Sequence, residues 1–195
     1  MNPSNLRNDM LTKGAIIGGV MLAASIAETS LMYYGGISLA MAAGLVVIVS
    51  FALYCYLVYR FTKNYANLVL EARKEMPYFT YGNGLAYIIL ISMLAGIITS
   101  LGGYIFLHQI VGYEEYMEAN VKLIQDALTM AQLPASMAGT YNAMIEGIKS
   151  QPAPSLFSTI LSGVWSYLML GTIVGLVVAA FTKRKPVIFG EQDEQ

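Results

Sequence analysis

Charged residues are scarce in this chain of 195 residues. Asp, Glu, Lys and Arg together make up 12% of it, whereas a soluble domain carries about 25%. The 11 basic residues do not outnumber the 12 acidic ones, so the chain lacks the basic excess that nucleic-acid binding requires. Apolar residues make up 56% of the chain. The composition therefore predicts an integral membrane protein and excludes a nucleic-acid partner.

Cysteine and histidine occur once each, as Cys55 and His108. One cysteine excludes a disulfide within the chain, and one histidine excludes a metal site built from several His and Cys ligands. The sequence has no glycine-rich phosphate loop after a strand and no serine in a nucleophile motif near His108. It predicts no catalytic constellation, no metal and no cofactor.

Four segments are long and apolar enough to cross a bilayer, which takes about 20 residues. They run from Gly14 to about Tyr34, from Ile37 to Tyr59, within Tyr81–Tyr113 and from Ser155 to Thr182. Each must be helical, because a chain in lipid satisfies its backbone groups only internally. We therefore predict an all-α integral membrane protein: four transmembrane helices, as two antiparallel hairpins, in a single domain over residues 1–195.

The first two connections differ in kind. Gly35-Gly36 is a turn too short for anything but a tight antiparallel hairpin. Residues 60–77 place apolar and polar side chains on separate helical faces, which predicts an amphipathic helix that Pro77 ends. It either continues the second segment or lies along the inner membrane surface. Tyr65, Leu68 and Val69 would form its docking face, for the membrane interface or for a partner.

Residues 114–154 form the only sizeable connection expected to face water. Two amphipathic series, separated by Leu133-Pro134, predict a pair of short helices packed as an outer hairpin. Just two basic residues, Lys122 and Lys149, fall in this region, and the other nine flank the remaining ends of the four segments. By the positive-inside rule, both termini and residues 60–77 are cytoplasmic and residues 114–154 are periplasmic, in a bacterial inner membrane. A cleaved signal peptide, cut near Ser25-Ile26-Ala27, is the alternative interpretation of the first segment.

Small residues recur four positions apart in three of the segments. The pairs are Gly14 and Gly18, Ser92 and Gly96, and Gly171 and Gly175. Such pairs let helix backbones approach closely. They predict contacts within the bundle or toward another chain.

Glu28 is the one formal charge inside the four segments. It lies fifteen residues beyond Lys13, about 22 Å along a helix, and an acid at that depth is a functional hypothesis by default. Polar residues expected at similar depth are Ser38, Ser100, Tyr104 and His108. Together they form a candidate intramembrane polar site, for a proton, a cation or a lipid head group. The alternative is a structural carboxyl whose hydrogen bonds join two helices.

Several short motifs in combination carry a resemblance to a known family. They are Lys13-Gly14, Phe79-Thr80-Tyr81-Gly82, the glycine-rich stretch Gly96–Gly103, an acidic segment after it, Gly171-Thr172-Ile173-Val174-Gly175, Ala179-Ala180-Phe181 and Lys183-Arg184-Lys185. The chain resembles a Bacteroidota inner-membrane family, domain of unknown function 4199. The resemblance implies four spans and no assigned activity. It also suggests proximity to polyprenyl-phosphate glycosyltransferases, and hence an anchor or accessory subunit.

Three functional hypotheses remain open from the sequence. The first is a non-catalytic subunit or scaffold of a membrane complex, with lipid and either a second copy or another membrane or peripheral protein as partners. The second is a small transporter or channel component that uses Glu28 in an oligomer. The third is a lipid-handling enzyme or a partner of one.

Overall fold

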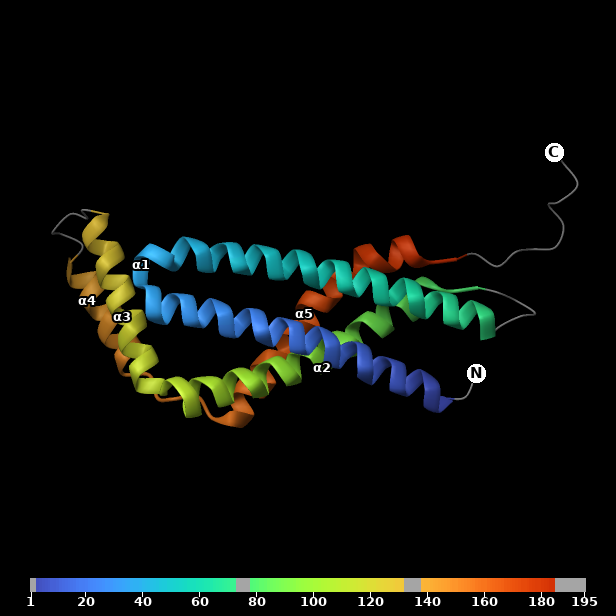
Figure 1. The fold of residues 1–195 in the computed structure, drawn as a ribbon, viewed down its shortest axis with the longest axis horizontal. Helices are drawn as coiled ribbons and strands as arrows, with labels where there is room; N and C mark the ends of the chain where they lie inside the picture. The colour runs from blue at the N-terminus through green and yellow to red at the C-terminus, as the bar shows by residue number, and fades with distance from the viewer. Residues whose placement is uncertain (1–2, 73–77, 132–137, 185–195) are drawn as a thin grey trace, which may run out of the picture.

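The computed structural model describes residues 3–72, 78–131 and 138–184 of the chain. In these ranges it is all-α, as predicted (Figure 1). Its elements are α1 (Pro3–Ala72), α2 (Tyr81–Ile105), the π-helix η1 (Phe106–Val111), α3 (Tyr113–Met130), α4 (Ala138–Lys149) and α5 (Leu156–Thr182). Three helices, α1, α2 and α5, are long and apolar enough to cross a membrane, the second together with η1. The number is three because α1 contains both the first and the second predicted segment.

Helix α1 folds back on itself at Gly36. This residue has φ 53° and ψ −146°, which is not a helical conformation. Residues with an L side chain rarely adopt it. Figure 1 shows the two arms of α1, residues 3–35 and 37–72, running side by side in opposite directions. The tight hairpin predicted at Gly35-Gly36 is therefore confirmed.

The second arm continues without a break through the segment predicted to be amphipathic. It remains helical to Ala72, so residues 60–72 extend the second predicted segment instead of forming a separate surface helix. The expected stop at Pro77 lies outside the described residues.

The three residues of the predicted docking face differ in their exposure. Tyr65 is 8% exposed, stacks on Tyr87 with ring centroids 4.1 Å apart, and meets Phe79 edge-on. Val69 also packs against the core, and Leu68 is the member of the face that is exposed, at 36%. The chain itself covers most of this face, because the segment leading into α2 and the start of α2 lie beside it.

Helix α2 is the central element, with α1 against one side and α5 against the other. The six small residues predicted to pack helices all lie at these contacts: at the five glycines an added Cβ atom would come within 3 Å of a neighbour, and Ser92 is the neighbour of one of them. The pairs are Gly14 with Leu94 and Gly18 with Ile98 between α1 and α2, and Gly96 with Gly163, Gly171 with Ser92 and Gly175 with Leu85 between α2 and α5. Their small size is thus used for contacts inside the chain.

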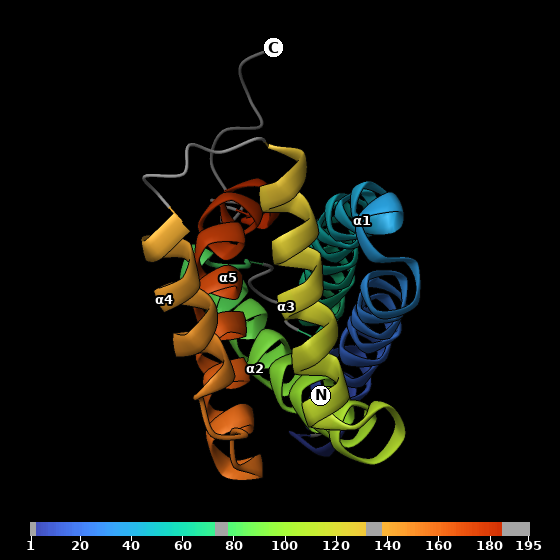
Figure 2. The same ribbon diagram turned by 90° about the vertical axis from the view of Figure 1, so that its left-hand side faces the viewer.

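The two ends of the helices differ in what covers them. Figure 2 looks onto one end and shows α3 and α4 side by side across it. At the opposite end lie the start of α1, the end of its second arm, the start of α2 and the end of α5 (Figure 1). A two-residue antiparallel bridge ties this end together, because Phe79 and Arg184 each donate a backbone N–H to the other's carbonyl, at 3.1 and 2.8 Å.

Candidate functional site

His108 lies in the π-helix η1, at the end of the bundle that α3 and α4 cover. Its ring stacks on Tyr104 with centroids 3.9 Å apart and planes 20° from parallel, and on Tyr113 with centroids 5.3 Å apart and planes 18° from parallel. A π-helical turn is rare, and such turns are frequently found at functional sites. Gly112, with φ 88°, ends this turn and allows α3 to start in a new direction.

The two ring nitrogens of His108 have different surroundings. Nδ1 lies 3.1 Å from the backbone oxygen of Tyr104, which is an acceptor, so Nδ1 donates and carries the proton. In the neutral ring Nε2 is then an acceptor. This atom is buried and has no hydrogen-bond partner within residues 3–72, 78–131 and 138–184. A buried acceptor without a donor costs free energy, so the site favours anything that brings an N–H or O–H group to it.

His108 lines a cavity of about 250 Å³ where the first arm of α1, α2, η1 and α5 come together. We call it the His108 cavity. Its other polar lining residues are Ser25, Thr99, Ser100, Tyr104, Tyr113 and Thr159, and its apolar walls include Leu107 and Pro154. The structure thus brings three of the predicted polar-site residues, Ser100, Tyr104 and His108, to one cavity.

Glu28 and Ser38 do not line the His108 cavity. Glu28 is half-buried on the first arm, one turn beyond Ser25, and makes no hydrogen bond or ion pair with the part of the chain that the structure describes. Ser38 is exposed just past the α1 turn and donates to the backbone oxygen of Gly35 at 2.7 Å. The predicted group of five residues is therefore split into a cluster of three and two separate positions.

Sequence reasoning missed four polar lining residues: Ser25, Thr99, Tyr113 and Thr159. Ser25 and Thr99 are single hydroxyls in apolar segments, where such residues are usual and carry no signal. The stacking of Tyr113 on His108 depends on the direction that Gly112 gives to α3. A six-residue π-helix leaves no periodic pattern from which the cavity could be found.

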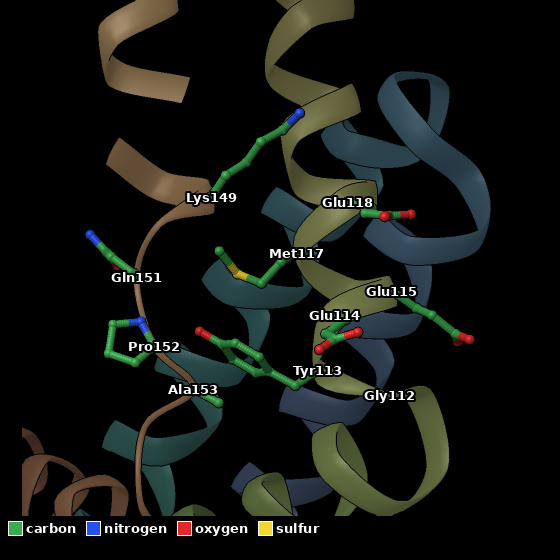
Figure 3. Close-up of a pocket in the computed structure, with 10 residues that line it drawn as sticks. All are labelled: Gly112, Tyr113, Glu114, Glu115, Met117, Glu118, Lys149, Gln151, Pro152 and Ala153. Carbon is green, nitrogen blue, oxygen red and sulfur yellow. The ribbon is translucent and has the colours of Figure 1, made fainter. Parts of the chain in front are cut away.

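A larger hollow of about 750 Å³ lies outside the His108 cavity, between the first turns of α3 and the segment that joins α4 to α5. Figure 3 shows Tyr113 and Met117 pointing toward this segment, and Glu115 and Glu118 pointing the other way. Lys149 reaches across from the end of α4 toward α3 (Figure 3). Tyr113 lines this hollow as well as the His108 cavity, so its ring belongs to the wall of both.

No three His, Cys, Asp or Glu side chains are placed to hold a metal ion in the described ranges. The polar groups of the candidate site are hydroxyls, tyrosine rings and a single imidazole. Such groups form hydrogen bonds.

The fold and this site define a helical protein with three helices able to span a membrane and a small polar cavity near one end of them. The chain belongs to the family described as Protein of unknown function (DUF4199), whose model matches residues 12–184. This confirms the resemblance stated from the sequence motifs. Neither the comparison with curated proteins nor the comparison with solved structures gives a match.

Proposed function

We propose that the chain is a non-catalytic subunit of a complex in a bacterial inner membrane. It crosses the membrane four times, once with each arm of α1 and once each with α2 and α5, and both termini are cytoplasmic. One face of the second arm of α1 contacts a transmembrane helix of a neighbouring subunit. The exposed apolar surface around Gly44 is the observation that carries this proposal.

We call this surface the Gly44 face; it consists of Met41, Gly44, Leu45 and Ile48. These positions share one side of a helix, because they are spaced three and four residues apart. Met41 is 81% exposed, Leu45 62% and Ile48 65%, and an added Cβ atom on Gly44 would meet nothing within 4 Å. The face therefore has large apolar side chains around a gap, and no other part of the described chain fills it.

Glycine inside a helix costs about 1 kcal/mol relative to alanine. At Gly14, Gly18, Gly96, Gly171 and Gly175 that cost is offset by close approach of a second helix in the same chain. Gly44 has no such neighbour among the residues that the structure describes. A helix of another subunit packed against it would make the same kind of contact.

The distribution of charge supports the four crossings and their direction. Basic side chains gather at the end formed by the start of α1, the end of its second arm and the end of α5; those in the described ranges are Arg7, Lys13, Arg60, Lys63, Lys183 and Arg184. The α3–α4 end carries Lys122 and Lys149 among five acids. The positive-inside rule then places the first end in the cytoplasm and α3 and α4 outside.

A packing role for the polar groups of the long helices supports a non-catalytic subunit. The Tyr54 and Ser92 hydroxyls bond to each other at 2.7 Å, and Thr99 donates to the backbone oxygen of Gly18 at 3.2 Å. Each of these bonds joins an arm of α1 to α2. They hold helices together instead of leaving reactive groups free.

Single cysteines test the topology, in a Cys55→Ala background. Lys63 and Thr129 are both exposed, near opposite ends of the molecule. In intact spheroplasts, an impermeant maleimide should label Thr129→Cys and leave Lys63→Cys unlabelled until the membrane is opened. The reverse pattern would overturn the proposed orientation.

Crosslinking in native membranes tests the subunit contact. Leu45→Cys in the same background should give a discrete crosslinked product, of twice the chain's mass if the neighbour is a second copy. A product that contains a polyprenyl-phosphate glycosyltransferase would identify the chain as its accessory subunit. Adding Gly44→Leu should abolish the product, because the new side chain fills the gap.

The matched control is Gly19→Leu, which adds the same volume to an exposed glycine on the first arm, with nothing within 4 Å. It should leave the product unchanged. Absence of any product, or equal loss with both leucine variants, would mean that lipid covers the Gly44 face and would overturn the proposal.

A further inference from the structure

The His108 cavity presents hydrogen-bond acceptors from three helical elements. The hydroxyl of Thr99 donates to the backbone oxygen of Gly18 and that of Thr159 to the backbone oxygen of Ser155, at 3.2 and 3.1 Å. With their protons used in this way, both threonine oxygens can accept; the Thr99 oxygen is also hydrogen-bonded to the Tyr167 hydroxyl, which leaves it one free lone pair. Nε2 of His108 is a third acceptor, with no donor among the described residues. A ligand complementary to this cavity is a donor of several hydrogen bonds.

The cavity lining also decides the charge of that ligand. Its residues are Ser, Thr, Gly, Tyr, Leu, Pro and His, without an Asp, Glu, Lys or Arg. An ammonium group could donate hydrogen bonds here, but it would lose its hydration with no carboxylate to compensate. A phosphate could accept from the hydroxyls of Ser25, Ser100, Tyr104 and Tyr113, but it would find no Lys or Arg to compensate for its charge. Neutral hydroxyl groups fit the acceptors without this cost.

The volume and the surroundings of the His108 cavity further restrict the class of ligand. A volume of about 250 Å³ holds roughly eight waters at their liquid density, enough for a glycerol unit or one sugar ring. Exposed apolar side chains lie near the lining positions in the sequence: Ile105, directly after Tyr104, is 48% exposed, and Phe157, two residues before Thr159, is 75% exposed. An acyl chain attached to the bound group would lie against such side chains.

We propose that the His108 cavity binds the hydroxylated head group of a neutral lipid, with His108 Nε2, Thr99 and Thr159 accepting hydrogen bonds from its hydroxyls. The site lies where the apolar part of α2 gives way to η1 and α3, the level at which head groups are found in the leaflet on that side. This inference does not depend on the subunit contact at the Gly44 face, since the two involve different parts of the chain.

The experiment measures the melting temperature of the purified full chain in detergent with three probes. They are 1-monooleoylglycerol, which has two free hydroxyls, methyl oleate, which has the same acyl chain and none, and free glycerol. Ligand that binds only the folded state raises the melting temperature, here by about 4 °C near saturation. We expect that rise with 1-monooleoylglycerol alone.

Each alternative result overturns a stated part of the proposal. An equal rise with methyl oleate would show that hydroxyls are not recognised. An equal rise with glycerol at the same concentration would identify a free polyol site instead of a lipid site. No rise with any probe would mean that water fills the cavity.

Variants then place the binding at this cavity. His108→Phe keeps a ring for stacking on the two tyrosines and removes both nitrogens, so it should abolish the response to 1-monooleoylglycerol. Should that variant fail to fold, Thr159→Val removes an acceptor at almost constant volume and should reduce the response. Ser162→Ala, at an exposed α5 position that does not line the cavity, is the control and should keep it. A full response in both His108→Phe and Thr159→Val would overturn the assignment.

Discussion

The phenol oxygen of Tyr54 lies 2.7 Å from the hydroxyl oxygen of Ser92, and this buried hydrogen bond joins the second arm of α1 to α2. Gly171 of α5 packs against the same point: an added Cβ atom there would lie 2.6 Å from Ser92 Oγ and 3.5 Å from the Tyr54 oxygen. Three helices therefore meet at one polar contact, surrounded by the apolar core that includes Ile88, Ile91 and Val174.

Tyr54→Phe should lower the melting temperature by about 2–4 °C. The ring remains, but the Ser92 hydroxyl loses its partner in a buried position, which costs about 1 kcal/mol. The double variant Tyr54→Phe, Ser92→Ala should recover much of the loss, because no hydroxyl is then left unpaired. Thermal melts of the unaltered chain, Tyr54→Phe, Ser92→Ala and the double variant form a double-mutant cycle. Strict additivity would show that this hydrogen bond contributes nothing.

The backbones of α2 and α5 approach each other closely at Gly96. An added Cβ atom would lie 2.9 Å from the backbone oxygen of Gly163, an atom that cannot move without shifting α5. Gly96→Ala should therefore lower the melting temperature, by an overpacking cost of about 1–3 kcal/mol.

Gly82→Ala is the matched control for this prediction. It is the same substitution in the same helix, at an exposed position with nothing within 4 Å. It should leave the melting temperature unchanged or raise it slightly, because alanine favours a helix more than glycine does. Equal effects of the two alanines would show that α2 and α5 do not approach as closely as described.

Tyr65 should fix the last turns of α1 to the rest of the molecule. Replacing its buried ring with alanine removes the stack on Tyr87 and the edge contact with Phe79, at a cost of about 3 kcal/mol. In inverted vesicles, Tyr65→Ala should be cut faster by trypsin at the exposed Lys63. Leu68→Ala, three residues further along at a 36% exposed position, should be cut at the unaltered rate. The opposite ranking would restore Leu68 as the anchoring residue.

The helical pattern around Tyr65 shows how far the sequence could lead. Its apolar face was predictable, since spacing alone defines it. What covers that face was not, because Phe79 and Tyr87 come from another part of the chain. The same limit applies to the small residues: Gly96 was predicted from its spacing with Ser92, whereas Gly163, on the other side of the same contact, was not among the predicted pairs.

The His108 cavity was less predictable from the sequence than these helix contacts. Ser100, Tyr104 and His108 could be grouped because they follow one another along one predicted helix. Ser25 and Thr159 join them only through the packing of α1 and α5 against α2. Glu28 is the one charged residue in the predicted spans, and it does not line this cavity.

Substitutions of Glu28 test whether its carboxyl group stabilises the fold. It is half-buried on the first arm and has neither a hydrogen bond nor an ion pair with residues 3–72, 78–131 or 138–184. A carboxyl without partners in apolar surroundings opposes folding, so its removal should not destabilise the chain. Glu28→Leu should leave the melting temperature in detergent unchanged or raise it, and Glu28→Gln should behave alike. A fall of about 2–4 °C with Glu28→Leu, but not with Glu28→Gln, would instead identify a hydrogen bond that joins two helices.

The Leu45→Cys crosslink, measured in the same two variants, separates an effect on stability from an effect on assembly. Loss of the crosslinked product at an unchanged melting temperature would place Glu28 in the contact with the neighbouring subunit.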